Sequence, residues 1–276
     1  MAHECGGCCP VWRRINGNAV DVALQAVKEE AVQAGACPDG LLVGAAGDRF
    51  SYCRGKFMLT VRAGQCVVAC PDLMERDVFD DVIALYAGQY PGADRRAVIS
   101  MWSMYYFSTL MISGAVSGLV LGMNIPAGID RLKLVSDGET GAPAGFLLPG
   151  GGWHLETAGD PELAMEAVLR EHAAPLVGAI ARNGGVSERL LWNNASAYLS
   201  WTVGEIAAFK GGGACGSCLM ENECWSDGRR NPLFGTIKLC ERDGNCFSCR
   251  KVCCLRYALP GVCGCGDLCP LPQGRA

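Results

Sequence analysis

Five cysteines lie close together near the end of the chain, and their side chains are the ones best suited to chemistry. They are Cys253, Cys254, Cys263, Cys265 and Cys269, within the segment RKVCCLRYALPGVCGCGDLCPLP. Thiolates gathered this closely bind soft metals such as zinc, or the iron of iron–sulfur clusters. The glycines between them allow the chain to fold back on itself. The sequence therefore predicts a metal site within residues 250–272.

The adjacent pair Cys253 and Cys254 helps to distinguish an iron–sulfur cluster from a zinc site. Zinc ribbons usually supply two C-x2-C pairs, each of which holds one side of a single ion. The side chains of two adjacent cysteines tend to point apart, so they do not easily hold one ion together. They suit a dinuclear cluster, because its two irons accept ligands at separate points. The pattern favours an iron–sulfur cluster, and a zinc-stabilised binding or structural module is the alternative.

This segment resembles the C-terminal signature of the ferric-siderophore reductase (FhuF) family. In that family two adjacent cysteines are followed by ten residues, a third cysteine, two residues and a fourth cysteine. The matching residues here are Cys253, Cys254, Arg256, Tyr257, Leu259, Pro260, Cys265 and Cys269. Leu268 departs from the pattern because it makes the last gap three residues long. Cys263 is a second departure and could replace Cys265 as a ligand.

The resemblance implies a [2Fe–2S] cluster on Cys253, Cys254, Cys265 and Cys269. It also implies an oxidoreductase of iron transport, a ferric reductase that passes one electron to Fe(III) in a siderophore of the hydroxamate type and releases Fe(II). No nucleotide-binding fingerprint is present, so we expect a separate electron donor, a ferredoxin or a flavoprotein. An iron–sulfur sensor without reductase turnover is a further alternative.

Weaker parts of the resemblance extend from about Ala97 to the C-terminus. They are the aromatic run Trp102, Tyr105, Tyr106 and Phe107, the Trp192-Asn193-Asn194 triplet, and Asn231-Pro232-Leu233. Asparagines inside an apolar helical stretch do not by themselves indicate a reaction. We expect them to pack and cap.

Composition and charge limit the kinds of molecule that the protein is expected to bind. The chain has 276 residues and a net charge of -4, which does not suggest nucleic acid as a partner. The cysteine-rich end is locally basic, so it is either a solvated face or a docking surface for an acidic electron donor or an anionic ligand. The N-terminus carries Arg13 and Arg14 where a signal peptide would be apolar, so we expect a cytoplasmic protein whose cysteines serve metal or redox chemistry.

The remaining cysteines leave open a second metal centre, a redox dithiol, or thiols without a ligand. Cys215 and Cys218 form a C-x2-C pair, and so do Cys246 and Cys249, although neither of these pairs has the βαβ context of thioredoxin chemistry. The candidates for a second centre are Cys5, Cys8, Cys9, Cys215, Cys218, Cys224, Cys246 and Cys249.

Apolar periodicity predicts an α+β fold, rich in helix, with two β-hairpins and a cysteine-rich tail. We expect an N-terminal helical region at 1–92, a central helical core with a hairpin at 93–213, and a second hairpin with the cluster-binding tail at 214–276. Phe57, Leu59 and Val61 alternate as in a short strand, whereas His172 lies beside Glu171 and is expected to face solvent.

The stretch 94–129 is the most apolar part of the chain and is long enough to span a membrane. Serines dilute it, and Gly114, Gly118 and Gly122 give it a smooth face for close approach of another segment. We expect a buried central helix, with peripheral association at the inner face of the cytoplasmic membrane as the alternative.

Overall fold

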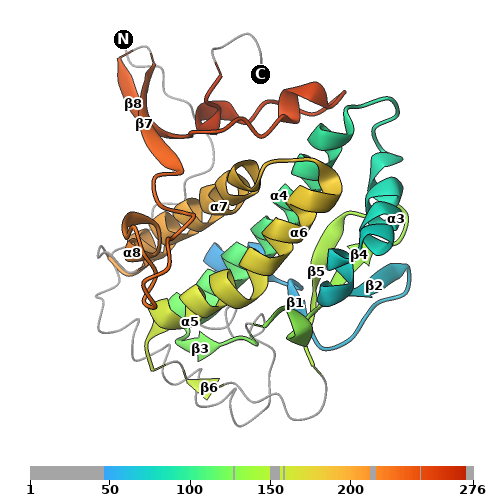
Figure 1. Ribbon diagram of the computed structural model, residues 1–276. Coiled ribbons are helices and arrows are strands. Elements are labelled where there is room, and N and C mark those ends of the chain that lie inside the picture. Colours follow the sequence, from blue (N-terminus) through green and yellow to red (C-terminus); the bar gives the residue numbers. More distant parts are fainter. Residues whose placement is uncertain are drawn as a thin grey trace.

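The computed structural model describes residues 47–126, 128–149, 156–157, 159–211, 216–242 and 244–271. The expected N-terminal helix and the leader cysteines Cys5, Cys8 and Cys9 lie outside these residues, and so does Cys215. The described part combines helices with three small sheets, which confirms the α+β class (Figure 1).

The helices form most of the described chain. After the 3₁₀ helices η1 (Gly47–Cys53) and η2 (Cys70–Met74), they are α3 (Arg76–Ala87), α4 (Arg95–Ala115), α5 (Pro161–Ala167), α6 (Ala174–Gly184), α7 (Glu188–Phe209) and α8 (Cys218–Glu221). Asp94, Asp160 and Ser187 cap α4, α5 and α7 by accepting hydrogen bonds from backbone N–H groups of the first turn. Pro161 stands at the first position of α5, where its missing N–H costs nothing.

The main sheet has four strands in the order β1-β5-β4-β2. These are β1 (Phe57–Met58), β2 (Gln65–Ala69), β4 (Lys133–Asp137) and β5 (Pro143–Leu147). Strands β4 and β5 form the expected hairpin within 131–149, closed by Asp137, whose carboxylate accepts from the Thr140 N–H at 2.8 Å. The expected strand through Phe57, Leu59 and Val61 is wrong beyond Met58, because Leu59 and Val61 are exposed outside any strand.

Two further pairs of strands complete the secondary structure. β3 (Met123–Asn124) pairs with β6 (Glu156–Thr157). β7 (Ile237–Arg242) and β8 (Asn245–Arg250) form an antiparallel hairpin, which confirms the second hairpin expected from the sequence. In Figure 1 this hairpin projects from the body and leads into the C-terminal segment, drawn in red.

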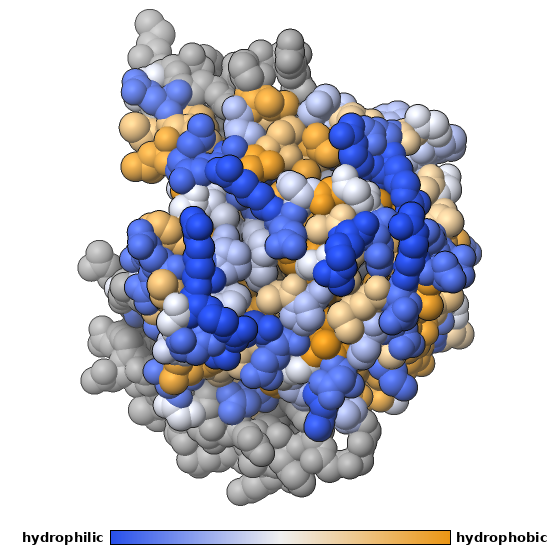
Figure 2. Space-filling view, in the orientation of Figure 1, coloured by the Kyte–Doolittle hydropathy of each residue, from blue (hydrophilic) through white to orange (hydrophobic). Residues whose placement is uncertain are grey.

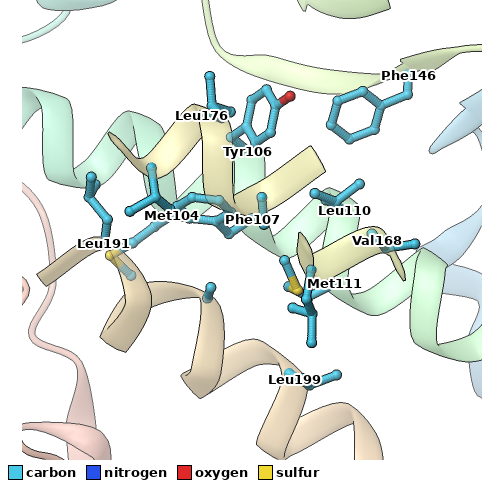
Figure 3. Close-up of a cluster of buried hydrophobic side chains, with 14 of the residues drawn as sticks. Met104, Tyr106, Phe107, Leu110, Met111, Phe146, Val168, Leu176, Leu191 and Leu199 are labelled. Atoms are coloured by element: carbon cyan, nitrogen blue, oxygen red, sulfur yellow. The ribbon is translucent and has the colours of Figure 1, made fainter. Parts of the chain in front are cut away.

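Helices α4 and α7 pack side by side and run in the same direction. Near their starts, Asn194 of α7 donates to Ser100 of α4, and further along both helices Thr109 and Trp201 line one cleft. Figure 3 shows the core formed where α4 meets α7, the α5–α6 segment and the sheet, with Phe107, Leu191 and Phe146 among its side chains.

The apolar stretch is confirmed as a buried central helix. Among the described residues, one helical segment, Arg95–Val120, is long and apolar enough to cross a membrane by length and composition, and 83% of its most apolar window is buried inside the protein. The glycine stripe admits α5, because Gly114 lies against Met165 and Gly118 against the Pro161 carbonyl oxygen. These contacts explain the small residues of the stripe without a membrane.

Two π-helical turns interrupt the helices. The first, η3 (Val116–Val120), ends α4, and the second, η5 (Val168–Ala173), joins α5 to α6. Pro175 lies just after η5 and has no N–H for the carbonyl four residues earlier, so the wider turn absorbs the mismatch. The helix therefore continues through this proline.

Candidate metal centre

The cysteine-rich tail begins where β8 ends and turns sharply after Cys254. Leu255 has φ 61°, in the left-handed region that a bulky side chain rarely adopts. This turn places the Leu255 N–H 3.4 Å from the Cys253 sulfur, to which it donates. Such strain persists where surrounding contacts enforce it, and it is concentrated at functional sites. Here it orients the adjacent cysteine pair.

All four cysteines of the expected ligand set line one small cavity with a volume of about 10 Å³. Cys254 and Cys269 are buried, and Cys253 and Cys265 are partly buried. The Cys254 and Cys265 sulfurs lie 3.8 Å apart. Two sulfurs bound to one tetrahedral ion, each about 2.3 Å from it, lie roughly 3.8 Å apart, so this pair already has the spacing of ligands that share an ion.

Cys263 takes a different position from Cys265. It is exposed and is not among the residues that line the cavity, whereas Cys265 is. Gly264, between them, lines the cavity, and Gly266 follows with φ 58°. The extra residue in the last gap is taken up by the short 3₁₀ helix η7 (Gly266–Leu268), after which Cys269 returns to the cavity.

Buried polar contacts tie the tail to the first turns of α4 and α7. The Ser100 hydroxyl donates to the Cys254 carbonyl oxygen at 2.7 Å, and the Asn194 side-chain amide donates to Ser100 and Ser103. The Asn193 side-chain oxygen accepts from the Val252 N–H at 2.9 Å. The asparagine pair therefore does more than pack and cap: it fixes the backbone on which Cys253 and Cys254 stand.

Arg250 is the residue of this site that the sequence pattern did not single out. Its side chain is only 2% exposed and donates to the Asn194 side-chain oxygen at 3.2 Å. Among the described residues, no carboxylate forms an ion pair with Arg250, and its Nε has no hydrogen-bond partner. A buried charge is costly unless it is compensated. The only sequence signal was a basic residue at the end of a strand before the cysteine pair.

Electrostatics at the cavity favour negative charge on the sulfur of Cys254. The hydrogen bond with Cys265, assisted by the charge of Arg250, holds the pKa of Cys254 below its ordinary value against the effect of burial. The same hydrogen bond and burial raise the pKa of Cys265, and burial raises that of Cys253. Thiolate is the form that binds metal. Four thiolates around two ferric ions and two sulfides, or around one zinc ion, carry two negative charges, which Arg250 and the cavity-lining Arg256 would offset.

The four cysteines therefore fit either a [2Fe–2S] cluster or a zinc ion. Their sulfurs are soft ligands that share one cavity, one pair has the spacing of ligands, and a buried arginine offsets their charge. Within the described ranges, the structure has no group of three or more His, Cys, Asp or Glu side chains already spaced as a metal site.

The other cysteines have varied surroundings. Cys240 and Cys249 form a disulfide across the β7–β8 hairpin. Cys246 is exposed and Cys249 is buried, because residues three apart on a strand face opposite sides, so the Cys246 and Cys249 pair does not form a dithiol. Cys218 contacts the Glu162 carboxylate, and Cys224 lines the same cleft. The second metal centre remains a prediction, because several of its candidate ligands lie outside the described residues.

The expectation that His172 faces solvent is wrong. Its side chain is 0% exposed, and its Nε2 lies 2.5 Å from the Tyr106 hydroxyl, which also reaches the Cys70 sulfur at 3.4 Å. The π-helical turn η5 carries His172 inward, against Tyr106 and Phe146. The neighbouring Glu171 did not predict which way His172 faces, because the π-helical turn breaks the regular helical period.

This chain is similar in sequence to known proteins over the helices that hold the site. The family model FhuF, described as ferric iron reductase FhuF-like transporter, matches residues 100–245. A ferric siderophore reductase from Escherichia coli (strain K12) is 26% identical over 177 residues, which is 63% of this chain. The chain spans 66% of that relative's length. The family match covers α4 from Ser100 onward, α7 and both asparagines, and it ends before the cysteine pair.

Among solved structures, aerobactin synthetase IucC from a hypervirulent pathotype of Klebsiella pneumoniae is similar with a TM-score of 0.42. The sequences are 16% identical, and the match covers 63% of this chain and 37% of that one.

Proposed function

Because the chain belongs to the FhuF family of ferric iron reductase-like proteins, we propose that it reduces Fe(III) held by a siderophore, preferably of the hydroxamate type, and releases Fe(II). The relative named ferric siderophore reductase supports this reaction class. The observation that carries the proposal is the shared cavity of Cys253, Cys254, Cys265 and Cys269 beside a buried arginine.

These four sulfurs would hold a [2Fe–2S] cluster. When bound, the cluster supplies a single electron. Hard hydroxamate oxygens hold Fe(III) far more tightly than Fe(II), so one electron loosens the chelate. No acid, base or nucleophile of the protein is needed for this step.

The protein's own residues set the conditions of the transfer. Asn194 and Ser100 fix the Cys254 backbone, so the ligand positions do not shift when the charge changes. Arg250 places a positive charge beside the cysteine pair, and hydrogen bonds such as that from the Leu255 N–H to Cys253 reach the sulfurs. Both effects favour the more negative, reduced state.

A separate electron donor, a ferredoxin or a flavoprotein, is part of the proposal, and so is a cytoplasmic location. The exposed cations near the tail support an acidic donor. An alternative location is the inner face of the membrane, where the protein would be peripherally associated. There the reductase would meet the ferric chelate where it is imported.

The test is anaerobic purification followed by optical and EPR spectra, with iron, sulfide and zinc counted per chain. We expect about two irons, a brown protein that bleaches with dithionite, and turnover of a ferric hydroxamate. Cys253→Ser and Cys254→Ser should each lose the cluster and the turnover, while Cys263→Ser, the matched control, keeps both.

Three outcomes would count against the proposal in different ways. A colourless protein that holds zinc would support the structural module. A cluster without ferric turnover would support the sensor. Loss of the cluster in Cys263→Ser with retention in Cys265→Ser would reassign the third ligand.

A further inference from the structure

A cleft lies between α4, α7 and η1, and we call it the α4–α7 cleft. Tyr52, Thr109, Ser113, Tyr198 and Trp201 are among the residues that line it. Its volume is about 420 Å³, within the range of small-molecule sites. Nothing in the metal centre or in the packing of the core accounts for a cleft of this size.

Aromatic rings form the wall of the α4–α7 cleft. The Tyr52 and Trp201 rings pack against each other with centroids 5.2 Å apart, and Phe50 supports Tyr52 from behind. Trp201 is 45% exposed, although it is one of the largest apolar side chains. An exposed tryptophan held in place by a second ring is typical of a surface that binds a ligand.

Hydroxyl groups line the rest of the cleft. Ser113 is 0% exposed, and its Oγ has no hydrogen-bond partner among the described residues; the Tyr52 hydroxyl is likewise buried without a partner in that part of the chain. An unsatisfied buried hydroxyl costs about 1–3 kcal/mol. A ligand whose oxygens accept hydrogen bonds would recover that cost, so the cleft suits an oxygen-rich ligand.

The charge of the lining fits a neutral chelate. Among the described residues that line the cleft, Lys56 is the one charged side chain, and its amino group donates to the Ala144 carbonyl oxygen at 3.1 Å. Burial is the main cause that raises the pKa of Tyr52 and of Tyr198, so both phenols stay protonated donors. The cleft beside α5 is different, because Asp160, Glu162 and Glu166 line it.

The α4–α7 cleft lies close to the cysteine cavity. Both sites are built on the same two helices: Ser100 and Asn194 hold the cysteine segment, and Ser108 and Tyr198 line the cleft. Eight residues separate Ser100 from Ser108, about 12 Å along a helix axis. Tyr198 lines the cleft and is near enough to the other site for the charges of Arg250 and Cys254 to act on its phenol.

From this geometry we propose that the α4–α7 cleft binds the ferric hydroxamate chelate, with Trp201 and Tyr52 against its organic backbone and the hydroxyls of Ser113 and Tyr52 toward its oxygens. The inference rests on the proposed function. The chelate then lies beside Tyr198 and near the cluster, a short distance for an electron to cross.

The experiment uses a gallium(III) trihydroxamate complex as the probe, because Ga(III) resembles Fe(III) in charge and size and is not reduced under these conditions. Binding to the purified full chain is followed by isothermal titration calorimetry and by tryptophan fluorescence. We expect Trp201→Ala and Ser113→Val each to weaken binding at least tenfold, with circular dichroism and cluster spectrum unchanged. Leu163→Ser, an equally exposed apolar residue outside the cleft, is the control.

The outcomes separate the cleft from the reaction. If wild type binds the gallium complex and both cleft variants bind it equally well, the cleft assignment is wrong while the reductase proposal stands. If Cys254→Ser loses ferric turnover but keeps gallium binding, the two sites are distinct, as proposed. A gallium tricatecholate, with three negative charges, should bind at least tenfold more weakly; equal or tighter binding would overturn the hydroxamate class.

Discussion

At the scale of single residues, the candidate centre depends on polar side chains buried far from one another in the sequence. Asn194 donates to Ser100 and Ser103 and accepts from Arg250, so one amide joins α4, α7 and the end of β8. Each of these partners is buried and would lose one hydrogen bond without it. The Cys254 backbone depends on this network through Ser100.

We expect Asn194→Ala to lower the free energy of unfolding by about 2–4 kcal/mol, because it removes the side-chain oxygen that accepts from the buried Arg250 guanidinium and one hydrogen bond from each of two buried hydroxyls. It should also lower the iron content per chain. Urea unfolding and iron analysis measure the two effects. Asn222→Ala, at an exposed site, is the control and should change stability by less than about 0.5 kcal/mol. An Asn194→Ala protein as stable and as iron-rich as wild type would contradict the role of the network.

At the scale of elements, the π-helical turn η5 decides the surroundings of His172. Burial lowers the pKa of His172 to about 3, so the folded protein holds it neutral against Tyr106, Cys70 and Phe146. The unfolded chain protonates it near its ordinary value of 6.5. The unfolded state therefore binds more protons between these values, and stability falls as pH falls from about 6.5 toward 3.

We predict that the unfolding free energy depends on pH more steeply in wild type than in a variant without His172. Between pH 7 and pH 5, wild type should lose on the order of 2 kcal/mol more unfolding free energy than His172→Gln, which has no proton to gain. Chemical unfolding at several pH values measures it. Tyr106→Phe keeps the buried histidine and should keep the wild-type slope. Equal slopes for wild type and His172→Gln would show that His172 is not held neutral.

At the scale of the whole molecule, the tail presents a surface suited to docking. Leu239 is 80% exposed and Tyr257 is 52% exposed, with exposed Lys238 and Lys251 on the same hairpin and its exit. Figure 2 shows hydrophobic and strongly hydrophilic residues side by side on the upper part of this face. Apolar side chains among cations are typical of a surface that meets an acidic electron donor.

Electron delivery from an acidic ferredoxin should slow as salt rises, because salt screens the attraction. The double variant Lys238→Glu/Lys251→Glu should reduce the second-order rate of cluster reduction at least tenfold at low salt, and dithionite should still reduce the cluster normally. Stopped-flow bleaching measures both rates. The double variant Arg54→Glu/Arg62→Glu, at two exposed positions near β1 and β2, is the charge-matched control. A salt-independent rate would place the donor elsewhere.

Local chemistry made much of this protein readable from its sequence. Cysteine spacing identified the candidate ligands, because a short glycine-containing segment can bring its own thiols together without help from the rest of the fold. Alternating apolar residues around Asp137-Gly138 and Asp243-Gly244 predicted both hairpins, since turn chemistry is local. The long apolar stretch predicted a central helix for the same reason.

Other features depended on contacts between distant segments, and only the tertiary structure decided them. The position of Cys265 at the cavity, the burial of His172 and the burial of Arg250 beside Asn194 all depend on contacts between elements that are distant in the chain. The partners Ser100, Asn194 and Arg250 are each dozens of residues apart in the chain. The physical reason is that burial and pairing are properties of a packed interface, which no single stretch of sequence contains.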